Sequence, residues 1–97
     1  MSIVFTFTPA GASMTASKYD ECIKRLEAAG AGNPKGRIYH VCYGDPDNLM
    51  VTDVWDSAES FEKFGATLMP ILGQLGIDPG QPVAHSVHNI IEAPAFV

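Results

Sequence analysis

Two polar side chains, His40 and Asp53, stand inside segments that are otherwise almost wholly apolar, RIYHVCY (37–43) and LMVTDVW (49–55). A strand buried on both faces has no solvated side for such groups, so each of them needs a partner. The intervening GDPDN segment is rich in turn-forming residues, which predicts a β-hairpin closed by a loop of about four residues. We therefore expect the histidine and the carboxylate to lie on neighbouring strands.

The position of the loop predicts the register of this hairpin. With residues 45–48 as the loop, the expected pairs are Cys42 with Val51, His40 with Asp53, and Ile38 with Trp55. Facing side chains of an antiparallel pair have Cβ atoms about 5 Å apart, so Asp53 can hydrogen-bond the imidazole and raise its basicity. The pair is then a candidate general base, although a slip of one residue would separate the two groups. The alternative is a structural pair that specifies the register or a dimer interface.

Aromatic residues near this pair could hold a planar ligand. Trp55 lies on the same predicted strand face as the carboxylate, and Phe61 and Phe64 belong to the apolar stripe of the following helix. We expect these three residues to wall an apolar pocket, with His88 as a second polar contact. His85 and His88 are three residues apart on a predicted strand and point to opposite faces, so they form no local metal pair.

Hydrophobic periodicity assigns the elements that position these residues. The predicted order is a strand at 3–8, a helix from about 15 to 30, the two hairpin strands, a helix at 57–76 and a strand at 83–91. This is the βαββαβ order of an α+β, ferredoxin-like domain that spans residues 1–97. Two right-handed crossovers place both helices on one face of a four-stranded antiparallel sheet.

Three local features refine the two predicted helices. The spacings S-x-x-D at 17–20 and D-x-x-E at 56–59 are typical of residues that cap helix starts. Pro70 removes a backbone donor, so we expect a kink or break near 68–70. Gly65 indicates a close approach of the second helix to a strand or a ligand.

The composition indicates an interface. Hydrophobic residues make up 46% of the 97-residue chain and charged residues only 18%, and both alternating sets of strand positions carry large apolar side chains, as in a sheet covered on two sides. The helices cover one side. We expect a twofold mate to cover the other, giving a homodimer in which the facing sheets form an α/β barrel. Tyr39 and Tyr43, on one face with Arg37 and Val41, are expected at this interface or in the core.

Charge and motifs exclude several partners. Six basic against eleven acidic residues give a net charge of −5, so the basic footprint of a protein that binds nucleic acid or an anionic membrane is missing. The apolar runs are too short for a membrane helix or a signal peptide, which predicts a cytoplasmic protein. Cys22 and Cys42 are expected to be reduced thiols. The sequence has no nucleotide, catalytic-triad or zinc motif, so we expect neither a cofactor nor a metal.

Several short motifs together resemble a known superfamily: HV at 40–41, DVWDS at 53–57, the F-x-x-F pair at 61–64, LMP at 68–70 and HN at 88–89. Over nearly the whole chain the sequence is similar to the dimeric α+β barrel superfamily, in particular to small bacterial proteins related to the antibiotic biosynthesis monooxygenases. The resemblance implies a ferredoxin-like monomer whose sheet packs against its twofold mate, with a cavity between sheet and helices in the members that are enzymes.

The resemblance leaves the activity open. The superfamily holds cofactor-independent oxygenases of aromatic polyketides, haem-degrading enzymes, lactone isomerases and many proteins without an assigned activity. The haem-degrading pattern pairs a strand tryptophan with a helical histidine, and the helix at 57–76 contains no histidine. Two hypotheses follow. One is a monooxygenase-like or isomerase-like enzyme without a cofactor, acting on a small apolar or aromatic molecule with His40 as general base. The other is a non-catalytic homodimer that binds a hydrophobic ligand or a partner protein.

Overall fold

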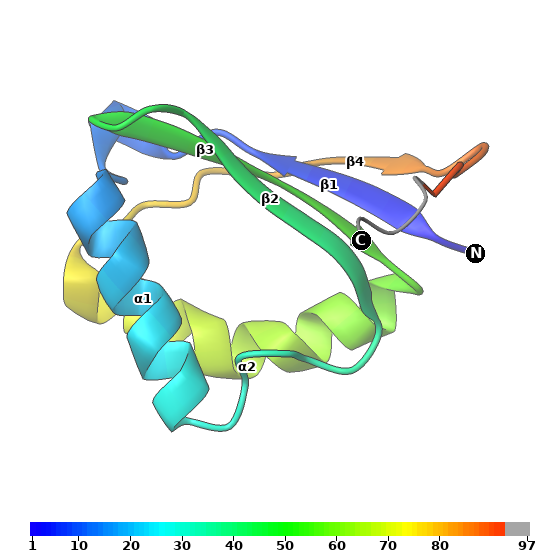
Figure 1. Ribbon diagram of the computed structural model, residues 1–97, viewed down its shortest axis with the longest axis horizontal. Helices are drawn as coiled ribbons and strands as arrows, with labels where there is room; N and C mark the ends of the chain where they lie inside the picture. The colour runs from blue at the N-terminus through cyan, green and yellow to red at the C-terminus, as the bar shows by residue number, and fades with distance from the viewer. Residues whose placement is uncertain (93–97) are drawn as a thin grey trace, which may run out of the picture.

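The computed structural model describes residues 1–92 and has the predicted βαββαβ order. Its elements are β1 (Ile3–Phe7), a short 3-10 helix η1 (Ala10–Ala12), α1 (Ala16–Ala28), β2 (Arg37–Asp45), β3 (Asn48–Trp55), α2 (Ala58–Leu75) and β4 (Val83–Ser86). The strands form one antiparallel sheet in the order β2-β3-β1-β4. Both helices lie on the same side of this sheet (Figure 1). The ferredoxin-like fold class is therefore confirmed.

The β2–β3 hairpin has the register that the sequence predicts around the polar pair. His40 faces Asp53 and Cys42 faces Val51. The connection is tighter than expected, because Asp45 and Asn48 also pair and leave only two residues in the turn. A two-residue and a four-residue loop centred on the same peptide bond give the same pairs, so the shorter turn does not change the register.

A β-bulge at the start of β2 corrects the prediction for Ile38. Arg37 rather than Ile38 faces Trp55, because the pairing shifts by one residue between Arg37 and Tyr39. An extra residue on one strand reverses the side-chain alternation beyond it. Arg37 therefore lies on the helix side of the sheet, and the prediction that it shares a face with Tyr39 and Tyr43 is wrong.

The helix boundaries differ in detail from the predicted caps. The side chain of Thr15 accepts a hydrogen bond from the Lys18 amide at the start of α1, and that of Ser57 accepts one from the Ser60 amide at the start of α2. These two residues have the extended backbone that an N-cap needs, so they replace the capping residues predicted at 17–20 and 56–59. Thr15 and Ser57 both belong to the residue types that are favoured at helix N-caps.

Pro70 does not break α2, which runs as one helix from Ala58 to Leu75. Pro70 and Ala66 lie on the exposed side of the helix. Water can therefore bond the carbonyl that the proline leaves without a donor, and the expected break is absent.

The last strand is shorter than the predicted 83–91. β4 ends at Ser86, which pairs with Ile3, the first residue of β1. One more contact follows, from the Val87 amide to the Ser2 carbonyl at 2.9 Å. Beyond it β1 offers no further partner, so the chain leaves the sheet before His88.

The core lies between the helices and one face of the sheet. On β3 the alternate residues Leu49, Val51, Asp53 and Trp55 are buried, and the residues between them are only partly buried. Trp55 is completely buried, with 0% of its surface exposed. The buried set of this strand therefore includes one carboxylate, Asp53, among apolar side chains.

The opposite face of the sheet carries no helix, and large apolar side chains on it are exposed to solvent. Tyr39 pairs with Val54 and Val83 pairs with Thr6 on this face, and their exposed fractions are 59% and 56%. We call this surface the open sheet face. Within residues 1–92 none of the helices has the length and apolar character needed to cross a membrane.

Candidate functional site

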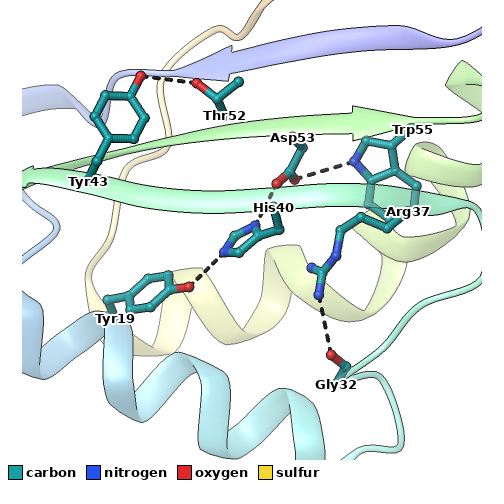
Figure 2. A network of polar contacts seen from close by, with 8 residues as sticks. All are labelled: Tyr19, Gly32, Arg37, His40, Tyr43, Thr52, Asp53 and Trp55. Atoms are coloured by element: carbon teal, nitrogen blue, oxygen red, sulfur yellow. Dashed lines mark hydrogen bonds and ion pairs between the residues drawn. The ribbon is translucent and has the colours of Figure 1, made fainter. Parts of the chain in front are cut away.

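A chain of three hydrogen-bonded side chains links the sheet to α1. His40 Nδ1 lies 2.5 Å from Asp53 Oδ1, and His40 Nε2 lies 2.6 Å from the Tyr19 hydroxyl oxygen. Trp55 Nε1–H donates to the other carboxylate oxygen of Asp53 at 3.3 Å. Figure 2 shows His40 pointing from β2 toward the Tyr19 hydroxyl on α1, with the Asp53 carboxylate between His40 and Trp55. We call Tyr19, His40 and Asp53 the polar triad.

The chemistry of the partners assigns the protons in the triad. An ionised carboxylate only accepts hydrogen bonds, so His40 Nδ1 is protonated and its N–H donates a hydrogen bond to Asp53. His40 Nε2 of the neutral ring is then an acceptor, and the Tyr19 hydroxyl donates to it. This arrangement is that of a base held in one tautomer by a buried carboxylate.

Tyr19 retains its proton at neutral pH. Burial raises the pKa of its phenol to about 12, and the nearby Cys42 and Asp53 add to the effect while Arg37 opposes it. The Tyr19 ring lies nearly parallel to the His40 ring, at an interplanar angle of 6° with centroids 6.0 Å apart. The phenol is therefore a hydrogen-bond donor to His40 in the resting protein.

Tyr19 was not predicted as a site residue. Its position on the apolar stripe of α1 indicated only core packing. The signal that could have identified it is the hydroxyl group, because a tyrosine that points into a core needs a polar partner. The histidine on the facing strand supplies that partner.

The polar triad lies on the wall of a cavity of about 300 Å³ between the sheet and the helices. Most of the remaining wall is apolar, and its members include Phe7, Met14, Leu26, Val51, Phe61, Phe64, Leu68, Leu72 and Ile77. A cavity of this size and character is typical of a site for a small organic molecule. The buried polar groups of the chain are thus placed where a ligand would meet them.

The predicted ligand-binding residues divide into two groups. Phe61 and Phe64 line the cavity, as expected. Trp55 is behind the wall, packed against these two rings with centroid distances of 5.6 and 5.4 Å. Its observed polar contact is with Asp53, so it holds the carboxylate in place rather than facing the cavity. His88 follows β4, is exposed and is not among the described cavity residues.

Arg37 is a second cavity residue that the sequence did not indicate. The β-bulge turns it toward the helices, where its guanidinium carbon lies 5.7 Å from the centre of the Phe64 ring. Its Nη2 donates to the Gly32 carbonyl at 3.3 Å, and the side chain lines the cavity beside the polar triad (Figure 2).

Gly65 opens space instead of allowing a close approach. It lines the cavity, and a Cβ atom built on it would meet no other atom within 4 Å. The expected contact with a strand is absent, and the missing side chain enlarges the cavity.

The cysteines and acidic residues offer no second reactive centre in residues 1–92. Cys22 and Cys42 are both free, and burial raises the pKa of each thiol, so both are protonated at neutral pH. Within the same range no three side chains of the metal-binding types gather at one point.

Solved structures share this fold. Protein YJCS matches with a TM-score of 0.63 at 13% identity, over 91% of this chain and 100% of its own. SnoaB, a cofactor-independent oxygenase from Streptomyces nogalater, matches with a TM-score of 0.58 at 18% identity, over 95% of this chain and 96% of its own. A candidate antibiotic biosynthesis monooxygenase from Chloroflexus aurantiacus J-10-fl matches with a TM-score of 0.57 at 19% identity, over 94% and 95% of the two chains.

The structural neighbours thus include proteins of the antibiotic biosynthesis monooxygenase type, which confirms the resemblance seen in the sequence at the level of the fold. Identities this low carry the fold and no further property. No protein-family model and no curated protein matches the sequence.

Proposed function

We propose that the protein is an enzyme that needs no cofactor and removes a proton from a small apolar or aromatic substrate, with His40 as the base that finally holds the proton. The observation that carries the proposal is the position of the polar triad, which ends in an apolar cavity of about 300 Å³. A partly buried histidine held by a buried carboxylate is typical of acid–base catalysis.

In the proposed step an acidic C–H or O–H group of the substrate lies against the Tyr19 oxygen. The substrate proton passes to this oxygen as the Tyr19 proton passes to His40 Nε2. Asp53 accepts a hydrogen bond from Nδ1 and stabilises the imidazolium that forms. The substrate retains the electron pair of the broken bond as an enolate or phenolate.

The fate of this anion defines the two versions of the activity. In the oxygenase version the anion transfers electrons to dioxygen. One oxygen atom of dioxygen becomes the new carbonyl oxygen of the product, and the other leaves as water. In the isomerase version the imidazolium returns the proton, through Tyr19, to a different substrate atom. SnoaB, which shares the fold, is a cofactor-independent oxygenase, and this favours the first version.

The shared proton-removal step can be measured without dioxygen. Anthrone is a tricyclic aromatic ketone with an acidic benzylic C–H, and its exchange for deuterium in heavy water under argon is followed by NMR. We expect the protein to accelerate this exchange and His40→Gln to reduce the acceleration by about 10²- to 10⁴-fold. His88→Gln, at an exposed histidine that follows β4 and is outside the described cavity residues, is the control and should match the wild type.

Equal acceleration by His40→Gln and the wild type would exclude His40 as the base. Circular dichroism of each variant checks that the fold is retained. Admission of air then separates the two versions, because only the oxygenase version forms the quinone faster than uncatalysed oxidation of anthrone does.

We further propose that a second copy of the chain covers the open sheet face. On this face Tyr39 and Val83 are exposed by 59% and 56%, and large apolar side chains exposed on a sheet face without helices are typical of an interface. A twofold mate presents the same apolar residues from its own open sheet face, so the two faces match in character.

A non-catalytic ligand-binding homodimer is the second candidate. One observation favours it: within residues 1–92 every buried polar side-chain atom already has a hydrogen-bond partner, including His40 and Asp53. In that case His40→Gln would lower the melting temperature, and the wild type would bind anthrone without accelerating its exchange.

A further inference from the structure

Arg37 is a cation in the cavity wall with no acidic partner in residues 1–92. The ion pairs of this part of the chain are Arg25 with Glu21, His40 with Asp53 and Lys63 with Glu59. Arg37 is also the only lysine or arginine among the described residues that line the cavity. In a chain with a net charge of −5, this leaves Arg37 as the one permanent cation described at the site, in the same wall as the Asp53 carboxylate, which is already hydrogen-bonded to His40 and Trp55.

The residues around Arg37 orient its guanidinium group but leave most of its N–H donors without an acceptor. A guanidinium carries five N–H donors, and the structure gives it one weak acceptor, the Gly32 carbonyl at 3.3 Å. Its guanidinium carbon lies over the Phe64 ring, 5.7 Å from the centre, a cation–π contact that positions the group without using an N–H donor. The remaining N–H groups are therefore available to a ligand.

The charge of Arg37 also reaches the polar triad. Burial raises the pKa of the Tyr19 phenol, and the positive charge of Arg37 acts in the opposite direction and lowers it. Figure 2 shows Arg37 and His40 descending from the same strand into the same space. A ligand in the cavity can therefore meet the guanidinium and the triad at once.

We propose that Arg37 binds an anionic oxygen of the substrate, so that the substrate class is a small aromatic or apolar molecule with a carboxylate, phenolate or enolate group. The inference rests on the proposed function, since it takes the cavity as the substrate site. The apolar body of the substrate would lie against Phe61 and Phe64, and the oxygen atoms of the substrate would accept hydrogen bonds from Arg37.

A matched pair of ligands tests this charge preference. Naphthoate and naphthamide have the same bicyclic body and differ in charge, and their binding is measured by calorimetry. We expect the wild type to prefer naphthoate by roughly ten- to a hundredfold, as for hydrogen bonds to a charged group. Arg37→Met should remove the preference, because it weakens the charged hydrogen bonds to naphthoate much more than the neutral one to the naphthamide carbonyl, and Arg37→Lys should retain part of the preference. Arg25→Met on α1, at an arginine outside the described cavity wall, is the control.

Three results would overturn the inference: a wild type that binds both ligands equally, a wild type that binds neither, or a preference that survives in Arg37→Met. A preference lost in His40→Gln but retained in Arg37→Met would assign the anion to His40 instead. The outcome is independent of the proton-removal step. If Arg37→Met loses the preference while His40→Gln still accelerates deuterium exchange, the substrate class stands and the proposed base fails.

Discussion

Two substitutions of Asp53 that look alike should have very different effects on stability. Asp53 accepts hydrogen bonds from His40 Nδ1–H and Trp55 Nε1–H. Asp53→Ala removes both acceptors. The indole N–H of Trp55 is completely buried and cannot reach water, which costs about 1–3 kcal/mol. The His40 side chain is 22% exposed, so water can partly replace its partner, and the total loss should be about 2–4 kcal/mol.

Asp53→Asn should keep every hydrogen bond by reversing two of them. The indole of Trp55 only donates, so the amide oxygen must face it, and the amide NH₂ then faces His40 Nδ1. His40 shifts its proton to Nε2, which donates to the Tyr19 oxygen. The stability loss should be smaller than that of Asp53→Ala, because the buried indole N–H of Trp55 keeps its acceptor, and only the Tyr19 O–H and one amide N–H at the cavity need water as a partner. Acceleration of deuterium exchange should vanish, since Nε2 can no longer accept a proton.

Urea unfolding gives the two free energies, and the ¹⁵N chemical shifts of the imidazole ring report which nitrogen carries the proton. The reasoning is wrong if Asp53→Asn is as destabilising as Asp53→Ala. It is also wrong if the proton of His40 stays on Nδ1 in Asp53→Asn.

Three further predictions concern the cavity, the phenol and the open sheet face. Gly65→Leu should fill the cavity and abolish naphthoate binding while raising the melting temperature, and Gly73→Leu, on the exposed side of α2, should raise it without affecting calorimetric binding. Tyr19→Phe should remove the phenolic absorbance change near pH 12. Between about pH 10 and 12 the wild type should lose more unfolding free energy than Tyr19→Phe, because its unfolded chain gives up the phenolic proton first. Tyr39→Glu should yield monomers in analytical ultracentrifugation; the helix-surface variant Ala66→Glu should remain dimeric.

The His40–Asp53 contact could be predicted from sequence because it depends on local features. The turn residues fix the centre of the hairpin, and the pairing of antiparallel strands then follows by counting. The apolar residues around both positions also indicate that the two groups share a buried face. The same reasoning predicted the fold class, since the order of strands and helices leaves few topologies.

The rest of the site depends on how distant elements pack. Tyr19 is one of several residues on the apolar stripe of α1, and only the docking of that helix on the sheet brings its hydroxyl to His40. Arg37 reaches the cavity because a bulge adds one residue to β2, which alternation alone does not reveal. His88 falls outside because β1 begins at Ile3, which pairs with Ser86, and leaves the residues that follow β4 without a strand to pair with.

The most direct test of the proposed site is a crystal structure of the protein with anthrone bound. The proposal predicts anthrone in the cavity against Phe61 and Phe64, with its benzylic carbon within about 3.5 Å of the Tyr19 oxygen, a distance suited to reaction. Anthrone bound on the open sheet face, or held in the cavity with that carbon directed away from Tyr19 and His40, would contradict it.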